Sequence, residues 1–159
     1  MRLTIAAVGK LKAGPERELF ERYVKLCKAG LSVSLGPLAL IETPESRRGS
    51  APERRQEEAA NLLRKSPAGS SIVALDETGR QQDSVEFSRF LAARRDEGLG
   101  DLVFAIGGAD GHGEDLLRAA VLKLALGRMT LPHGLARIML SEQIYRAITI
   151  LCSHPYHRA

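Results

Sequence analysis

A cluster of glycines follows one of the most apolar stretches of the chain. Gly107, Gly108, Gly111 and Gly113 come directly after residues 102–106, which have the composition of a buried strand. Because glycine has no side chain, such a loop lets the backbone approach a ligand closely, and ligands of open α/β sheets bind beyond the carboxyl ends of the strands. The spacing matches neither a Walker loop nor a dinucleotide fingerprint, so a plain strand-to-helix turn stays open as an alternative.

Two other chemistries are disfavoured. Asp110 and His112 in the glycine-rich loop are metal-ligand types, but the sequence offers no third ligand nearby. Ser141 and His133 could form a hydrolase pair, yet the chain lacks the Gly-x-Ser-x-Gly motif of a nucleophile elbow. We therefore expect neither a metal centre nor a serine hydrolase.

A second candidate site is the short segment 126–132, which lies between two predicted helices. Its main-chain amides and carbonyls could hold a flat heterocycle, whereas a short edge strand is the simpler interpretation. The third candidate is the end of the chain, where residues 154–158 combine histidine, tyrosine and arginine, the types that bind phosphate and stack on bases. A frayed terminus is the alternative there.

The last predicted helix, over 135–152, is apolar on more than one side. We expect the sheet to cover one side and a second subunit to cover another. Arg137, Ser141 and Tyr145 recur at helical spacing, which predicts a polar face.

These candidate sites need a scaffold, and the apolar pattern predicts alternating strands and helices. We expect strands at 3–8, 71–75 and 102–106, an irregular extended segment over 31–41, a turn over 76–80, and helices at 15–29, 52–65, 83–97, 114–125 and 135–152. Asp83 opens its helix with a capping-box pattern. Residues 1–159 are predicted to form a single α/β domain with a mostly parallel sheet flanked by helices.

The composition supports a globular protein with one core. The chain has 159 residues, 44% of them hydrophobic and 26% charged, which excludes disordered and collagen-like classes. Cys27 and Cys152 are too few for a disulfide framework. No stretch is long and apolar enough to span a membrane, and the amino terminus does not resemble a signal peptide. We expect a cytoplasmic protein that does not associate with membranes.

The charge distribution points to an anionic partner. The net charge is +4, and residues 128–159 contribute four arginines, one acid and three of the four histidines. Only 4% of the residues are aromatic, too few to fill a core and also to build a base-stacking platform. Any binding of RNA must therefore depend mainly on charge and shape.

Five short motifs, in this order, resemble one known family. They are AVGKLK at 7–12, FAIGG at 104–108, MTLPH at 129–133, EQIYRA at 142–147 and the ending YHR at 156–158. Over its whole length the chain is similar to the RlmH-type methyltransferases of the SPOUT (α/β-knot) superfamily.

The resemblance implies a SPOUT-type fold with a trefoil knot in its carboxyl-terminal part, against the general rule that chains are unknotted. Knot and cofactor site would occupy about 71–152, and residues 153–159 would form an RNA-facing tail. It also implies a homodimer that uses S-adenosylmethionine to methylate N3 of a pseudouridine in 23S ribosomal RNA, on assembled ribosomes. No metal is required, because the sulfonium already supplies the leaving group.

The resemblance also assigns residues. Those implied for the cofactor are Leu75, Gly107, Gly108, Leu126, Gly127, Arg128, Met129, Thr130 and Leu131. Those implied to face RNA are His133, Arg137, Tyr145, Arg146, Tyr156, His157 and Arg158. His157 and Tyr156 are the candidate catalytic residues because the N3 proton must leave, with His133 or solvent as alternative acceptors.

Two other interpretations compete with this one. A nucleotide-binding oxidoreductase would need a glycine fingerprint after the first strand, which residues 9–12 do not supply. A non-catalytic ribosome- or RNA-binding factor that uses the basic tail alone is the remaining alternative, and it predicts no binding of S-adenosylmethionine.

Overall fold

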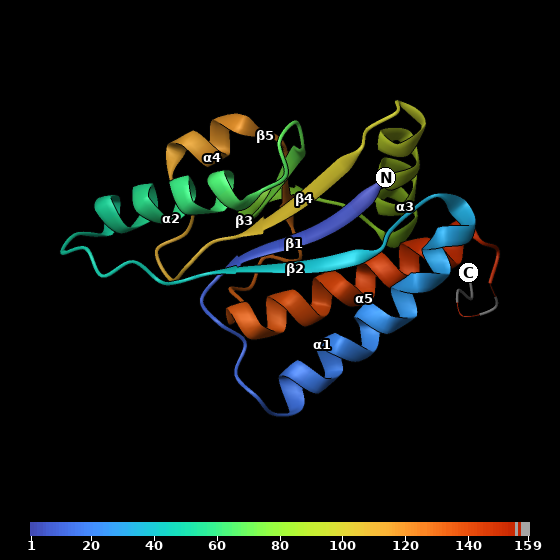
Figure 1. Ribbon diagram of the computed structural model, residues 1–159, viewed down its shortest axis with the longest axis horizontal. Helices are drawn as coiled ribbons and strands as arrows, with labels where there is room; N and C mark the ends of the chain where they lie inside the picture. Colours follow the sequence, from blue (N-terminus) through green and yellow to red (C-terminus); the bar gives the residue numbers. More distant parts are fainter. Residues whose placement is uncertain (155, 157–159) are drawn as a thin grey trace.

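A five-stranded sheet lies at the centre of the protein, and its strands run parallel (Figure 1). The computed structural model describes residues 1–154 and 156. In the order β2-β1-β4-β3-β5, the strands are Leu38–Thr43, Arg2–Val8, Asp101–Ile106, Ser71–Gln81 and Ala120–Ala125. Parallel pairing brings their carboxyl ends to one edge of the sheet, where the loops that can bind a ligand gather.

Helices cover both faces of the sheet. On one side lie α1 (Pro15–Leu26), the 3-10 helix η1 (Cys27–Val33), α3 (Ser84–Asp96) and α5 (His133–Leu151). On the other side lie α2 (Ala51–Lys65) and α4 (Glu114–Ala119) (Figure 1). None of the helices in the described residues is long and apolar enough to cross a membrane.

The two helical layers explain why the central strands are apolar throughout. In β1, Leu3 and Ile5 belong to the core beneath α1, α3 and α5, whereas Ala6 and Val8 belong to the core beneath α2 and α4. Strand β4 alternates in the same way, and all six of its residues are buried. The prediction of a single α/β domain with a parallel sheet flanked by helices is confirmed.

Capping residues set the starts of two helices. The Asp83 carboxylate accepts hydrogen bonds from the Val85 and Glu86 amides, at 2.8 and 2.7 Å, and the Glu86 carboxylate accepts one from the Asp83 amide. This is the capping box expected from the sequence. Ser50 and Glu53 form a second one at the start of α2.

The predicted helix over 114–125 is wrong in its second half. Helix α4 ends at Ala119, and Ala120–Ala125 forms β5, an edge strand that pairs with β3. Here exposed Val121 and Lys123 alternate with the more buried Leu122 and Leu124, the period of two that a strand requires. The more buried apolar side chains therefore lie on one face of a strand that pairs with β3, rather than on one face of a helix.

Two further predictions differ from the structure. Residues 31–33 belong to η1 rather than to an extended segment, because the Leu35 amide donates to the Gly30 carbonyl and closes a tight turn before β2 begins. The predicted turn over 76–80 is part of β3, which continues to Gln81. Its pairing with β5 shifts register between Leu75 and Arg80, so the strand bends without ending.

Candidate functional site

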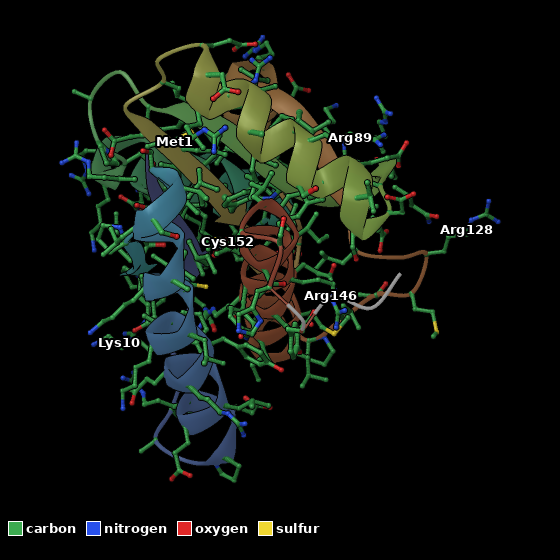
Figure 2. The ribbon with its side chains drawn as sticks, turned by 90° about the vertical axis from the view of Figure 1, so that its right-hand side faces the viewer. Met1, Lys10, Arg89, Arg128, Arg146 and Cys152 are labelled. Atoms are coloured by element: carbon green, nitrogen blue, oxygen red, sulfur yellow. The ribbon has the colours of Figure 1, made fainter. Side chains whose placement is uncertain are left out.

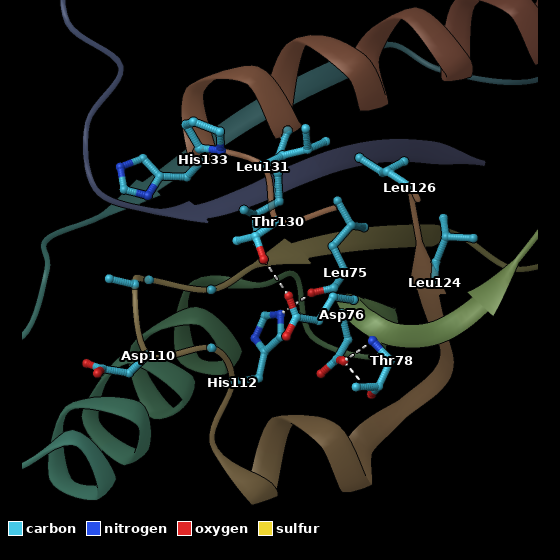
Figure 3. Close-up of a pocket in the computed structure, with 18 of the residues that line it drawn as sticks. Leu75, Asp76, Thr78, Asp110, His112, Leu124, Leu126, Thr130, Leu131 and His133 are labelled. Carbon is cyan, nitrogen blue, oxygen red and sulfur yellow. Dashed lines mark hydrogen bonds between the residues drawn. The ribbon is translucent and has the colours of Figure 1, made fainter. Parts of the chain in front are cut away.

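A cleft of about 960 Å³ opens at the carboxyl edge of the sheet. Three segments form its walls: residues 75–78 of β3, the glycine-rich loop after β4, and the loop from β5 to α5 (Figure 3). Arg55 of α2 also lines it. The volume lies within the range of sites that bind cofactors and other small molecules.

Most peptide groups of the loop from β5 to α5 have no main-chain partner among the described residues. Residues 127–131 belong to no helix or strand, and they form no main-chain hydrogen bond with any described residue. The hydroxyl of Thr130 donates to the Glu77 carboxylate at 2.8 Å, which ties the loop to the end of β3 (Figure 3). A row of free amides and carbonyls along a cleft can hydrogen-bond the polar edges of a ligand.

The glycine-rich loop folds back on itself beside this segment. The Gly111 amide donates to the Gly108 carbonyl at 3.0 Å. A Cβ atom on Gly107 would lie 2.9 Å from the Gly111 carbonyl oxygen, and one on Gly108 would lie 2.6 Å from Oε2 of Glu58. Both positions therefore need glycine for the packing of the loop itself.

His112 joins two walls of the cleft. Its Nε2 donates to the Leu75 carbonyl at 2.9 Å (Figure 3). Burial lowers the pKa of the His112 imidazole, although the bond to Leu75 and the Asp76 carboxylate act in the opposite direction. The neutral ring thus connects the glycine-rich loop to the end of β3 and fixes the Leu75 carbonyl.

Asp110 has a structural partner. Its carboxylate accepts two hydrogen bonds from the Arg54 guanidinium, at 2.7 and 3.2 Å, and the contact lowers the pKa of Asp110. Nowhere in the described residues do three His, Cys, Asp or Glu side chains gather as metal ligands would. Asp110 and His112 are thus committed to contacts within the protein.

The structure brings together most of the residues assigned to the cofactor. The cleft is lined by Leu75, Gly107, Gly108, Leu126, Gly127, Met129, Thr130 and Leu131. Arg128 lies in the same loop but does not line the cleft, and its side chain projects away from the body of the protein (Figure 2). Sequence reasoning missed the lining residues Asp76, Glu77 and Thr78, because it placed them in a turn.

Two of the residues assigned to RNA lie inside the protein. Arg137 has no exposed surface, and Tyr145 is only 8% exposed. Nη2 of Arg137 donates to the carbonyls of Val8 and Gly9, at 2.7 and 2.8 Å, and Nη1 lies 3.2 Å from the Glu42 carboxylate. The prediction that Arg137 and Tyr145 face RNA is therefore wrong for the protein as it folds here.

The physical reason lies in how α5 packs. Its apparent polar face, which includes Ser141, turns inward, and Arg137 attaches the helix to the carboxyl end of β1. Burial lowers the pKa of the Arg137 guanidinium, and the neighbouring Glu42 opposes that shift. A buried arginine thus satisfies strand-end carbonyls that the sheet leaves unpaired.

The remaining residues assigned to RNA lie at two ends of α5. His133 is exposed in the first turn and lines the cleft. Arg146 is half-buried and forms an ion pair with Glu142 at 2.7 Å. The two positions are separated by about 20 Å along the helix axis. A single protomer therefore does not bring them together.

The described part of the tail packs on the distal half of α5. The Tyr156 ring lies 4.9 Å from the Tyr145 ring and 5.2 Å from the Arg146 guanidinium, and its hydroxyl is 3.4 Å from the Glu142 carboxylate. Tyr156 does not line the cleft of its own chain. His157 and Arg158 lie outside the described residues.

Comparisons with known proteins point to one family. A family model described as "Predicted SPOUT methyltransferase" matches residues 1–157. Proteins named "Ribosomal RNA large subunit methyltransferase H" match over the full length of both chains, with 52% identity in Xanthobacter autotrophicus and 50% in Bradyrhizobium diazoefficiens.

Among solved structures, the SpoU methyltransferase AviRb from Streptomyces viridochromogenes, in complex with AdoMet, matches with a TM-score of 0.42 and 13% identity. The match covers 96% of this chain and 59% of that one. The family model and the full-length relatives are decisive: the chain belongs to the SPOUT methyltransferase family.

Proposed function

We propose that this protein methylates N3 of a pseudouridine in large-subunit (23S) ribosomal RNA, using S-adenosylmethionine, and that it acts on assembled ribosomes in the cytoplasm. The observation that carries the proposal is the cleft lined by the unpaired main chain of Gly127 and of residues 129–131. It lies in a chain of the SPOUT methyltransferase family whose relatives are named as large-subunit ribosomal RNA methyltransferases.

The residues of the cleft fit S-adenosylmethionine. Leu75, Leu126 and Leu131 offer apolar surface for a flat adenine, and the neighbouring main chain can hydrogen-bond its edges. Asp76 and Glu77 place carboxylates where a ligand with cationic sulfonium and ammonium groups is favoured. When bound, the cofactor supplies a methyl group already activated by positively charged sulfur.

The task of the protein is then mainly one of positioning. Methyl transfer forms a bond between N3 and the methyl carbon while the carbon–sulfur bond breaks, so the two reacting atoms must be held in line. His112 fixes the Leu75 carbonyl on one wall, and His133 stands at the start of α5 on another. The N3 proton passes to a base or to water, and His133, Tyr156 and His157 are the candidate acceptors.

We also propose that two chains pair through α5, so that the tail of one completes the cleft of the other. Leu135 and Met139 lie one turn apart on α5, and each is 43% exposed. Ile138, by contrast, is only 8% exposed and belongs to the core of its own protomer. The position of Tyr156 away from its own cleft supports a role in the partner's cleft. The trefoil knot stays a prediction from family membership.

The test uses ribosomes that lack the modification. Incubation with labelled S-adenosylmethionine should place one methyl group on a pseudouridine, identified by mass spectrometry of the nucleosides. Calorimetry should show one cofactor bound per chain; an absence of binding would support the non-catalytic alternative. Removal of residues 156–159 should abolish methylation and leave the cofactor affinity nearly unchanged, because the cleft is built from residues before 137. Normal methylation by the truncated protein would refute the role of the tail.

A further inference from the structure

The connection between β2 and α2 carries positive charge that the fold does not use. In this segment, residues 44–50, called here the basic loop, Arg47 and Arg48 are both exposed. Arg47 forms no side-chain hydrogen bond or ion pair with any described residue, and Arg48 makes a single 3.5 Å contact with Glu57. Exposed contacts of this kind contribute little to stability, so the two arginines are available to a partner.

The backbone of the basic loop is nevertheless held in one shape. The Ser46 amide donates to Oε1 of Glu58 at 2.9 Å, and the Ser46 hydroxyl donates to the Glu57 carboxylate. The Arg48 amide donates to the Ser46 hydroxyl at 3.2 Å, and its carbonyl accepts from Nη1 of Arg54 at 3.2 Å. The two arginines are thus presented at fixed positions, and binding through them costs little ordering of the backbone.

The same contacts attach the basic loop to the cleft. Glu58 is 5% exposed, and its Oε2 occupies the space that a side chain on Gly108 would fill. Arg54 of α2 pairs with Asp110 of the glycine-rich loop. Figure 1 shows the two loops side by side at the carboxyl edge of the sheet. Arg55, the next residue of α2, lines the cleft directly.

We propose that Arg47, Arg48 and Arg55 bind backbone phosphates of the RNA whose base enters the cleft. A guanidinium group can donate two parallel hydrogen bonds to the oxygens of one phosphate. Arg54 is excluded because its Nε and Nη2 donate to Asp110 and its Nη1 donates to the carbonyls of Arg48 and Gly49. Because contacts of Glu58 and Arg54 hold the basic loop beside the glycine-rich loop, a phosphate bound by these arginines would bring the RNA to the opening of the cleft. This inference rests on the proposed function and adds a surface outside the tail.

The experiment compares two doubly substituted proteins that lose the same charge. The test variant is Arg47→Ala/Arg48→Ala. The control is Arg64→Ala/Arg89→Ala, at exposed positions on α2 and α3 that do not line the cleft (Figure 2 labels Arg89). Binding to unmodified ribosomes is measured by sedimentation at several salt concentrations, independently of methylation, and cofactor affinity is measured by calorimetry.

We expect the test variant to bind ribosomes at least about tenfold more weakly near physiological salt, with a salt slope lower by about two. Its KM for ribosomes should rise while kcat and cofactor affinity stay close to wild type, and the control should behave as wild type throughout. Equal ribosome affinity and salt slope in the test variant and wild type would overturn the proposal, as would an equal loss in the control. A wild-type protein that binds ribosomes but transfers no methyl group would refute the proposed function alone.

Discussion

Replacing Arg137 with methionine tests whether this buried cation holds α5 on the sheet. Methionine fills much of the same volume but cannot donate a hydrogen bond. The change removes the donors to the Val8 and Gly9 carbonyls and the guanidinium that faces Glu42. The Val8 and Gly9 carbonyls and the Glu42 carboxylate stay in place, so their oxygen atoms stay buried without the hydrogen bonds that Arg137 donated.

The magnitude follows from what is left unpaired. Each buried carbonyl that loses its donor costs about 1–3 kcal/mol. Glu42 keeps the Leu11 amide at 2.6 Å and is 18% exposed, which limits its share. Breaking a buried pair from one side typically costs about 3–5 kcal/mol, and we expect a loss near the middle of that range. For a protein of this size, this lowers Tm by roughly 8–16 °C.

The assay is urea unfolding followed by circular dichroism at a fixed protein concentration. Arg128→Met is the matched control, because Arg128 is exposed and its replacement should change the unfolding free energy by no more than about 0.5 kcal/mol. Adding Glu42→Gln to Arg137→Met should cost less than the two separate losses together. If Arg137→Met destabilises the protein by less than about 1 kcal/mol but weakens binding to ribosomes, the structural role given to Arg137 is refuted.

Three further changes test the cleft, the dimer and the response to pH. Gly107→Val should displace the Gly111 carbonyl and weaken cofactor binding at least about tenfold in calorimetry. Gly100→Ala is the control, because nothing lies within 4 Å of a Cβ atom at that position, and it should leave cofactor binding unchanged. Normal binding by a folded Gly107→Val protein would contradict the cleft assignment. Met139→Asp should shift sedimentation from dimer to folded monomer, and a monomeric wild type at micromolar concentration would rule the dimer out. Burial lowers the pKa of His112 below 6.5, so the unfolded chain takes up this proton first and the unfolding free energy should fall as the pH drops from about 7 toward the lowered pKa. His112→Asn should flatten this part of the pH profile, and an unchanged slope between pH 7 and 5 would show that another group titrates.

The parts of the fold that the sequence predicted are those where local pattern and tertiary environment agree. Residues 3–8 and 102–106 form continuous apolar runs because both faces of β1 and β4 are covered. The Asp83 capping box acts through neighbours in the chain. Strand β5 was missed because its short alternating pattern follows α4 without a breaking residue, and only pairing with β3, far away in sequence, selects the extended form.

In the candidate site, too, the features that the sequence predicted are local ones, and those that it did not predict depend on distant contacts. The glycine-rich loop and residues 126–131 could be identified because glycine spacing and an isolated short segment are local features. Arg137 could not be placed, since a helical wheel assigns arginine to the solvent side, whereas the carbonyls that it satisfies lie at the end of β1, more than a hundred positions earlier. In the sequence His112 stands out only as a metal-ligand type, and its partner in the structure, the Leu75 carbonyl, carries no sequence signal.

The strand order β2-β1-β4-β3-β5 also constrains how the chain can fold during synthesis. Strand β1 pairs with β2 some thirty-five positions later, so this pair can form early. Its other neighbour is β4, and the pairing of Arg2 with Asp101 must wait until about a hundred residues have emerged. Until then one edge of β1, among the most apolar segments of the chain, has no partner. Contacts between such distant segments slow folding. We therefore expect the nascent protein to expose an open sheet edge for much of its synthesis and to depend on chaperones at that stage.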